Sequence, residues 1–188
     1  MQSRLFKRFV TDDGRTVVLR QPHRRDAERL LVFINGLVNE KGRAKSSQLY
    51  TGFESPLTLK QEKAWLGELL TEIRNGKVIS VVAEVDGKIV GNGEIVRGEY
   101  KETRHHGRLA VTIHGTHRGL GIGREMIRTL LAEARRQRLR NVHVEFLAGN
   151  KQAVSAYEKA GFKKFGAIPG KVYRNERFRD AIIMARTI

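Results

Sequence analysis

A glycine-rich junction between a predicted strand and a predicted helix constrains this chain more than any other stretch of its sequence. The run 109–113 is apolar and rich in β-branched residues, which is typical of a buried strand. Beyond the junction, apolar residues recur with the spacing of one buried helix face: Ile122, Met126, Ile127, Leu130, Leu131 and Ala134. Glycines let the backbone approach a ligand closely, and the free N–H groups at a helix start attract an anion. The junction predicts a phosphate or pyrophosphate site, although a plain glycine turn has the same local pattern.

The spacing of the glycines narrows the kind of phosphate site. No Gly-Lys-Ser/Thr follows them, which excludes a P-loop, and they do not fall on the GxGxxG pattern of dinucleotide-binding folds. They match the pattern Arg/Gln-x-x-Gly-x-Gly, with Arg118, Gly121 and Gly123 at the fixed positions. Between a strand and a helix, this motif resembles the coenzyme A loop of the GNAT (Gcn5-related) N-acetyltransferases.

A second stretch strengthens this resemblance. Residues 142–147 have the apolar pattern of a strand, and Asn150 can then cap a helix that ends at Gly161. The run NKQAVSAYEKAGF is similar to the family's second signature, in which Asn150 is followed seven residues later by Tyr157 and then by Gly-Phe. The resemblance covers residues 15–188, and the C-terminal half is similar to the ribosomal-protein alanine N-acetyltransferases.

The resemblance implies a fold. We expect a single α/β GNAT domain over residues 15–188, with a mixed central sheet, strands that splay at the acetyl-CoA site, and flanking helices. Residues 1–14 are polar and basic and contain the turn sequence Asp12-Asp13-Gly14. They are expected to form an N-terminal arm or an edge hairpin.

The hydrophobic pattern places the elements of this domain. We expect strands at residues 16–21, 78–85, 88–96, 109–113, 142–147, 162–168 and 176–188, and helices at 26–38, 59–73, 122–134 and 151–160. Thr58 and Gln61 form a capping-box pattern, and Asp86-Gly87 predicts a hairpin. Residues 41–56 are expected to be a loop, which in the resembled family helps to wall the acceptor site.

The resemblance also implies a cosubstrate, acetyl-CoA, and the residues that bind it. The backbone of Val111, Thr112 and Ile113 matches the strand that holds the pantetheine arm and polarises the thioester. The residues that match the pyrophosphate cradle are Arg118, Gly119, Leu120, Gly121, Ile122, Gly123 and Arg124. Asn150 matches a pantetheine ligand, with a plain helix cap as its alternative role, and Arg118 could also be a surface charge.

Two residues match catalytic positions of the family. Tyr157 matches the tyrosine that protonates the leaving thiolate, since a phenol keeps its proton at neutral pH. Its alternative role is a core tyrosine. Glu145 lies five residues before Asn150, like the proposed base of the ribosomal-protein alanine acetyltransferases, although a solvent-facing strand residue fits equally well. Arg108 stands where many relatives carry a carboxylate, so Glu94 and Glu99 are further candidates for the base.

The composition bounds the partners of this chain. It has 188 residues, no cysteine and a formal net charge of +16. The absence of cysteine excludes disulfides and thiolate metal sites, and the spacing of the six histidines predicts no metal site. No apolar run reaches the length of a membrane span and the N-terminus lacks a signal-peptide core, so we expect a cytoplasmic protein without a membrane partner. The charge favours acidic partners and non-specific nucleic-acid association, or is simply a basic solvated surface.

The sequence as a whole predicts an enzyme that transfers an acetyl group from acetyl-CoA to a primary amine. A protein N-terminal or lysine amine is the preferred acceptor, because the positive charge would repel a polycationic small molecule. A small-molecule amine acetyltransferase, an enzyme with a longer acyl donor and a non-catalytic CoA-binding regulatory module are the alternatives. The sequence leaves open whether the chain forms a homodimer.

Overall fold

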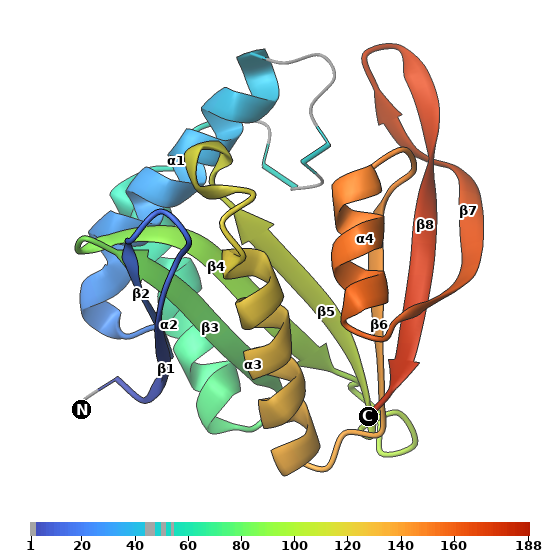
Figure 1. Cartoon of the computed structure of the whole chain (residues 1–188), viewed down its shortest axis with the longest axis horizontal. Helices are drawn as coiled ribbons and strands as arrows, with labels where there is room; N and C mark the ends of the chain where they lie inside the picture. The colour runs from blue at the N-terminus through green and yellow to red at the C-terminus, as the bar shows by residue number, and fades with distance from the viewer. Residues whose placement is uncertain (1–2, 44–47, 50–51, 54) are drawn as a thin grey trace.

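Figure 1 shows the computed structural model, which describes residues 3–43, 48–49, 52–53 and 55–188. Its centre is an eight-stranded mixed sheet with the strand order β1-β2-β3-β4-β5-β6-β8-β7. The strands are β1 (Leu5–Val10), β2 (Thr16–Arg20), β3 (Val78–Val85), β4 (Lys88–Arg97), β5 (His106–Ile113), β6 (Asn141–Leu147), β7 (Lys163–Arg174) and β8 (Arg177–Thr187). The helices are α1 (Ala27–Arg43), α2 (Leu59–Arg74), α3 (Ile122–Arg136) and α4 (Lys151–Lys159). The predicted single α/β domain is confirmed.

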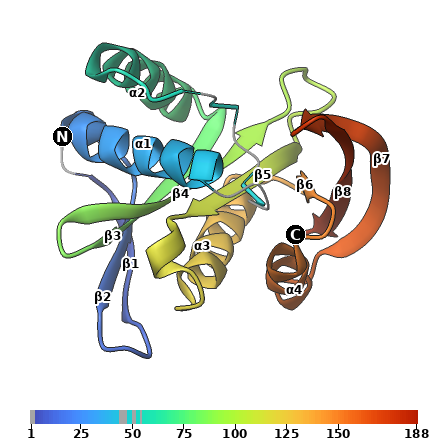
Figure 2. The ribbon, with the colours of Figure 1, turned by 90° about the horizontal axis from the view of Figure 1, so that it is seen from above.

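The helices cover the two faces of the sheet in pairs. Figure 2 shows α1 and α2 on one face and α3 and α4 on the other. Alternate side chains of a strand point to opposite faces, and the core divides accordingly. Val82 and Ile89 pack with α1 and α2, whereas Val81, Ile95 and Leu109 pack with α3. The amphipathic stripe predicted for residues 122–134 is buried against this second face, and Met126 and Leu130 are completely buried.

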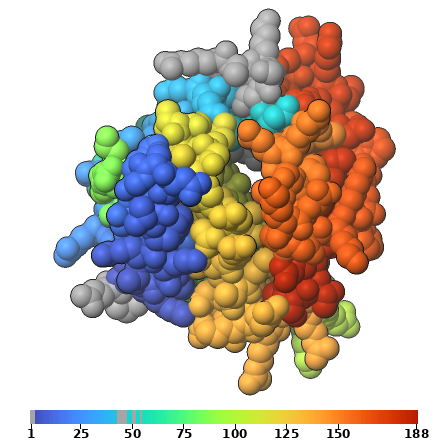
Figure 3. Space-filling view, in the orientation of Figure 1, coloured from blue at the N-terminus to red at the C-terminus, as the bar shows by residue number. Residues whose placement is uncertain are grey.

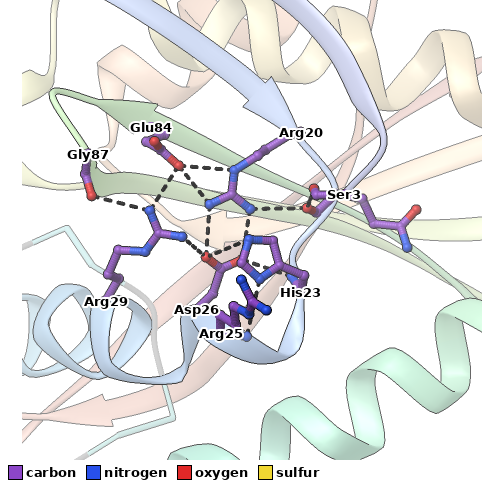
Figure 4. A network of polar contacts seen from close by, with 9 residues as sticks. Ser3, Arg20, His23, Arg25, Asp26, Arg29, Glu84 and Gly87 are labelled. Atoms are coloured by element: carbon purple, nitrogen blue, oxygen red, sulfur yellow. Dashed lines mark hydrogen bonds and ion pairs between the residues drawn. The ribbon is translucent and has the colours of Figure 1, made fainter. Parts of the chain in front are cut away.

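A buried charge network fixes the start of α1 against the sheet (Figure 4). Arg20 of β2 donates to both carboxylate oxygens of Asp26, at 2.7 and 2.8 Å, and also to Glu84 of β3 at 2.7 Å. Arg29 of α1 donates to the same two carboxylates. Asp26 also accepts from the backbone N–H of His23 at 2.8 Å, so all of its lone pairs have partners close by. The network sets the direction in which α1 leaves β2.

The sheet opens between β5 and β6. These two strands are the parallel pair of the sheet, and their register runs only from His106 opposite Asn141 to Leu109 opposite Val144. Beyond Leu109, β5 keeps its antiparallel partner β4, and β6 keeps its partner β8, but the two strands no longer pair with each other. The predicted splay is therefore present, and the edge of β5 from Ala110 onward is open.

Several elements differ in length from the prediction. Helix α1 continues through residues 41–43, and of the predicted 41–56 loop residues 44–47, 50–51 and 54 lie outside the described residues. Strand β7 does not stop at Ile168 but runs to Arg174. Its register against β8 shifts between Ile168 and Val172, which places Pro169 and Gly170 in an irregularity where the missing proline N–H costs no ladder bond. Strand β1 pairs with β2 at the edge of the same sheet.

Candidate active site

A cavity of about 690 Å³ lies where β5 and β6 separate. Its walls come from the open part of β5, from β6, from the N-terminal turn of α3 and from α4. Figure 3 shows an opening in the surface between the yellow and gold atoms that lead into α3 and the orange atoms of α4. Gln48 and Leu49, from the segment predicted as a loop, complete the lining. We call this space the first cavity.

The open edge of β5 presents backbone groups to the first cavity. The N–H of His114 donates to the carbonyl of Val90 on β4, so the even-numbered residues of this strand point their backbone groups toward β4. Val111 and Ile113 therefore point theirs toward the open edge. Arg118 Nε donates to the Ile113 carbonyl at 3.0 Å. The Val111 N–H is thus a fixed donor at the cavity wall, whereas the backbone of Thr112 faces β4.

The glycine loop before α3 holds a row of free donors. The N–H of Arg118 donates to Gly115 and that of Glu125 to Gly121, but the backbone N–H groups of residues 119–124 donate to no described residue. Gly119 and Gly121 have φ values of +82° and +78°, a region that side-chain-bearing residues rarely adopt. A Cβ at Gly119 would meet nothing within 4 Å, and one at Gly121 only the end of Arg124. The loop leaves open space in front of its amides, which suits the two phosphates of a pyrophosphate.

The side chains of this loop have other tasks. Ile122 is buried in the core and contributes only its backbone to the surface, and Leu120 packs partly against the same core. Arg118 is turned away from the glycines and binds Glu40 of α1 with both terminal nitrogens, at 2.5 and 3.0 Å. Nε of Arg124 lies 3.6 Å from Oε1 of Glu125, and the arginine side chain is about half exposed. The free hydrogen-bond donors of this loop are consequently its backbone N–H groups, with the arginine side chains beside them.

Tyr157 lies on the buried face of α4 and lines the first cavity. Its ring stacks on Phe146 of β6, with centroids 5.5 Å apart, and meets the edge of Phe162 at the same distance. Burial raises the pKa of the phenol above its ordinary value, so the hydroxyl keeps its proton through neutral and mildly alkaline pH. The residue is both a packed core aromatic and a cavity wall.

Asn150 is the N-cap of α4 and another residue of the first cavity. Its side-chain oxygen accepts from the backbone N–H of Ala153 at 3.0 Å. This bond fixes the amide group, and its two N–H donors have no acceptor among the described residues. Both roles expected for Asn150, helix cap and ligand donor, are therefore compatible.

Glu145 lines the first cavity but faces the side of the sheet opposite Tyr157. Its neighbours Val144 and Phe146 pack into the α3 and α4 core, so the alternation of β6 turns Glu145 toward the other face. Its carboxylate accepts a hydrogen bond from Lys171 of β7 at 2.6 Å. Glu99, the last of the sequence candidates for the base, is exposed in the connection after β4 and is absent from the lining of this cavity.

A second cavity, of about 200 Å³, lies on the α1 and α2 side of the sheet. It shares Ala110 and Thr112 with the first cavity. In the β4–β5 ladder, Asn92 lies opposite Thr112 and Glu94 opposite Ala110, so the four residues form one patch of the cavity wall. Burial raises the pKa of Glu94, an effect that the exposed Arg108 partly offsets. The two cavities meet along the open edge of β5.

Glu62 of α2 is a lining residue of the second cavity that the sequence analysis did not identify. It is 1% exposed, and burial raises the pKa of its carboxyl group to about 7. In the sequence it resembles an acidic residue of a first helical turn, a common surface feature. Its spacing of four residues from Leu66 and seven from Leu69 places it on the buried stripe, and this was the available signal.

The structure brings together two histidines, His106 and His143, that lie 37 positions apart in the sequence. His106 and His143 stack across β5 and β6 with ring centroids 4.7 Å apart, and Nε2 of His106 lies 2.6 Å from Nδ1 of His143. Their contact lies within the short paired part of the two strands, which begins where His106 pairs with Asn141. Within the described ranges, no group of three histidine, aspartate or glutamate side chains is arranged to hold a metal ion.

Comparisons with known proteins give consistent results. The model of a family described as "Acetyltransferase (GNAT) family" matches residues 46–162. A curated relative from Pseudomonas aeruginosa, an L-methionine sulfoximine/L-methionine sulfone acetyltransferase, is 25% identical over 137 residues, which cover 70% of this chain and 75% of the relative.

Solved structures share the fold. The ribosomal-protein-alanine N-acetyltransferase of Brucella melitensis aligns with a TM-score of 0.76 and 24% identity over 90% of this chain and 99% of its own. A phosphinothricin acetyltransferase from Sinorhizobium meliloti, solved in complex with acetyl-CoA, aligns with a TM-score of 0.76 and 17% identity over 92% of this chain and 88% of its own. Across the described part of the chain, no helix is both long and apolar enough to cross a membrane.

Proposed function

The chain belongs to the acetyltransferase (GNAT) family and is an acetyl-CoA-dependent N-acetyltransferase, and from this premise we propose that it acetylates a primary amine by direct transfer at the open edge of β5. The observation that carries the proposal is the meeting of two cavities at Ala110 and Thr112. One cavity has the free backbone donors that a pyrophosphate needs, and the other has carboxylates. An acyl donor and an amine can therefore approach the same strand from opposite sides of the sheet.

In the proposed complex, acetyl-CoA extends from the glycine loop toward Tyr157. The amides of residues 119–124 bind the pyrophosphate, and the open edges of Val111 and Ile113 bind the pantetheine arm together with Asn150. The N–H of Val111 donates to the thioester carbonyl and stabilises the negative charge that develops on its oxygen. Such a donor is effective because the sheet holds it in place before the reaction.

The transfer step has a simple balance of bonds and protons. The amine nitrogen attacks the thioester carbon, the tetrahedral intermediate collapses, and the carbon–sulfur bond breaks. Tyr157 gives its proton to the departing thiolate, and the new amide loses one proton to a base. The raised pKa of Tyr157 keeps the acid in its working form. Positioning of the two reactants supplies the larger part of the rate, of the order of 7–11 kcal/mol in well-aligned systems.

Two carboxylates are candidates for the base. Glu145 faces the acceptor side of the sheet and lines the first cavity, which supports its predicted role. Its carboxylate is engaged in an ion pair with Lys171 of β7. Glu94 lies opposite Ala110 in the second cavity, and burial raises its pKa, which favours uptake of a proton. The pH dependence of the Glu145→Gln and Glu94→Gln variants distinguishes the two.

The acceptor class predicted from the sequence, a protein N-terminal or lysine amine, is supported by likeness to the Brucella melitensis ribosomal-protein-alanine N-acetyltransferase. A small-molecule amine is supported by the size of the second cavity and by the curated relative from Pseudomonas aeruginosa. Release of free thiol from acetyl-CoA, followed with N-terminal peptides, lysine peptides and small amines, tests both classes. A protein that binds acetyl-CoA and releases no thiol with any amine would instead be a regulatory module.

A further inference from the structure

We propose that Glu62 and Asn92 form the floor of the amine-binding site, where they hold a primary ammonium group carried on a short apolar stem. This inference rests on the proposed acetylation of an amine and names the chemistry by which the acceptor is recognised. It is independent of which carboxylate acts as the base.

The two residues bring unpaired oxygens to one cavity. Oε1 of Glu62 and Oδ1 of Asn92 are both buried, and neither has a hydrogen-bond partner among the described residues. Both residues line the second cavity. Buried polar atoms in native proteins nearly always have partners, and those without one commonly await a ligand or serve a chemical role. The ionised Glu62 carboxylate and the Asn92 amide oxygen are both acceptors, so a hydrogen-bond donor is the partner that satisfies the two together.

An ammonium group fits this pair better than a hydroxyl or an amide. It offers three N–H donors and a positive charge, and it lacks any acceptor that the two oxygens would repel. The raised pKa of Glu62 agrees with a carboxyl group that stands without a cation. Glu94 adds a second carboxyl group to the wall of the same cavity. A bound cation would therefore favour the ionised form of Glu62.

The apolar wall and the volume of the second cavity determine which chemical group can carry the bound amine. Most of the remaining wall is apolar and comes from α1, from α2 and from the segment between them: Phe33, Ile34, Leu37, Phe53 and Trp65. A volume of about 200 Å³ is below the usual range for a drug-sized ligand and suits a group of a few heavy atoms. Thr112, opposite Asn92 in the ladder, also lines the first cavity, so the bound nitrogen lies on the path to the thioester.

The sequence around Glu62 holds its side chain in place. Thr58 and Gln61 form the predicted capping box at the start of α2, with the Thr58 N–H donating to Gln61 at 2.9 Å. Leu66 and Leu69 anchor the same face of the helix in the core. Glu62 therefore stays on the buried side, and among the described residues it has no ion pair. Burial without a partner is costly for the ionised carboxylate, and a bound cation would offset this cost.

The test compares Glu62→Gln with Glu68→Gln, an exposed glutamate of the same helix. Thiol release from acetyl-CoA is followed with n-butylamine, alanine amide, leucine amide and a hexapeptide that begins with alanine. Loss of the charged hydrogen bond in Glu62→Gln should raise the KM for the amine about 10- to 100-fold. The KM for acetyl-CoA and the melting temperature should change little, and Glu68→Gln should match the wild type. Asn92→Ala, which removes a neutral acceptor, should raise the amine KM about two- to tenfold.

The outcomes separate this inference from the proposed function. If the wild-type protein acetylates these amines and Glu62→Gln leaves their KM unchanged, the inference is overturned and the function stands. If only polyamines or long lysine side chains are acetylated, the short apolar stem is overturned. If no amine of any kind releases thiol, the proposed function fails first. Activity with the hexapeptide but not with the amides, or the reverse, identifies the source of the amine.

Discussion

Glu40 of α1 receives both terminal nitrogens of Arg118, at 2.5 and 3.0 Å, across 78 positions of sequence. The same carboxylate accepts from the N–H of Gly115 at 3.2 Å, and the Arg118 Nε donates to the carbonyl of Ile113. The arginine of the glycine motif therefore ties the loop to α1 and to the end of β5. Its geometry is that of a support for the loop rather than of a phosphate ligand.

This contact predicts the direction in which a substitution at Glu40 changes the affinity for acetyl-CoA. Glu40→Gln weakens the pair with Arg118 and should raise the Kd for acetyl-CoA about two- to fivefold, the effect of losing a partly exposed ion pair. Arg118→Lys should act in the same direction, because lysine cannot make the two-point contact. Isothermal titration calorimetry measures both. If Arg118 instead bound phosphate directly, its release in Glu40→Gln would tighten acetyl-CoA binding.

A leucine in place of Gly123 should block the cosubstrate without unfolding the protein. Gly123 lines the first cavity in helical conformation, and an added Cβ would meet Ile113 at an ordinary 3.6 Å. The rest of the side chain would extend into the space before the free amides. Gly67→Leu, at an open position of α2, is the matched control for helix propensity. We expect acetyl-CoA affinity to fall at least tenfold in Gly123→Leu only; equal affinities by calorimetry would contradict the placement of the pyrophosphate.

Removal of the Tyr157 hydroxyl should slow turnover and spare binding. Tyr157→Phe keeps the ring that stacks on Phe146 and loses only the proton donor. We expect kcat to fall about 10²- to 10⁴-fold with little change in the Kd for acetyl-CoA. Because burial raises the pKa of this phenol, the wild-type rate should show no loss of the acid below pH 9. Tyr100→Phe, at an exposed tyrosine, should behave as wild type. Full activity of Tyr157→Phe would make Tyr157 a packing residue alone.

The pH profile of Glu145→Gln tests the role predicted from the sequence. A base matters most at low pH, where the amine is protonated and must lose its proton before attack. If Glu145 is the base, the rate of the variant relative to wild type should be lowest at low pH and recover as pH rises. Glu94→Gln should then show a smaller and flatter effect. The reverse pattern would assign the base to Glu94.

The buried pair of Arg20 and Asp26 predicts a pH-dependent stability. Burial disfavours the charged form of Asp26, but the hydrogen bonds from Arg20 and His23 outweigh it and hold the pKa below the ordinary value. A carboxyl group with a lowered pKa stabilises the fold above its unfolded pKa, near pH 4, and this contribution disappears as pH falls through the folded value. Asp26→Asn should cost about 3–5 kcal/mol near pH 7 because it leaves Arg20 buried without its main partner.

Urea unfolding at a series of pH values measures this effect. The difference in unfolding free energy between wild type and Asp26→Asn should be constant from pH 8 to pH 5 and shrink in more acidic solution. Asp12→Asn, at an exposed position of the β1–β2 turn, should have almost no effect. A difference that grew toward acid pH would reverse the assigned sign.

Local patterns in the sequence predicted the strands, helices and turns that surround the first cavity. The glycines of the α3 junction, the cap at Asn150 and the face of Tyr157 each depend on residues within a turn or two, so their spacing carries the information. The ion pairs of Arg118 with Glu40 and of Lys171 with Glu145 join distant parts of the chain, and no spacing rule reveals them. The strand predicted at residues 162–168 is shorter than β7, because the continuation of β7 depends on a register shift against β8, which is a property of the strand pair and not of either sequence alone.

Glu62 shows the same limit of local patterns in another form. Its spacing from Leu66 and Leu69 is that of the buried face of α2, but the role of a buried glutamate follows only when the opposite wall of the cavity is known. Asn92 and Glu94 of β4 supply that wall, and the sequence of α2 gives no information about them. The chemistry of the second cavity thus arises where side chains of α1, α2, β4 and β5 come together.

The short ladder between β5 and β6 has a mechanical consequence. Among the described residues, backbone pairing between strands β1–β5 and strands β6–β8 is confined to residues 106–109 and 141–144. The sheet therefore consists of two parts joined by one short ladder, and the stacked rings of His106 and His143 lie at this ladder. A small change of angle there becomes a larger change of width at Val111 and Tyr157. The separation of the two walls of the first cavity therefore depends on the angle at which the two parts of the sheet meet in this short ladder.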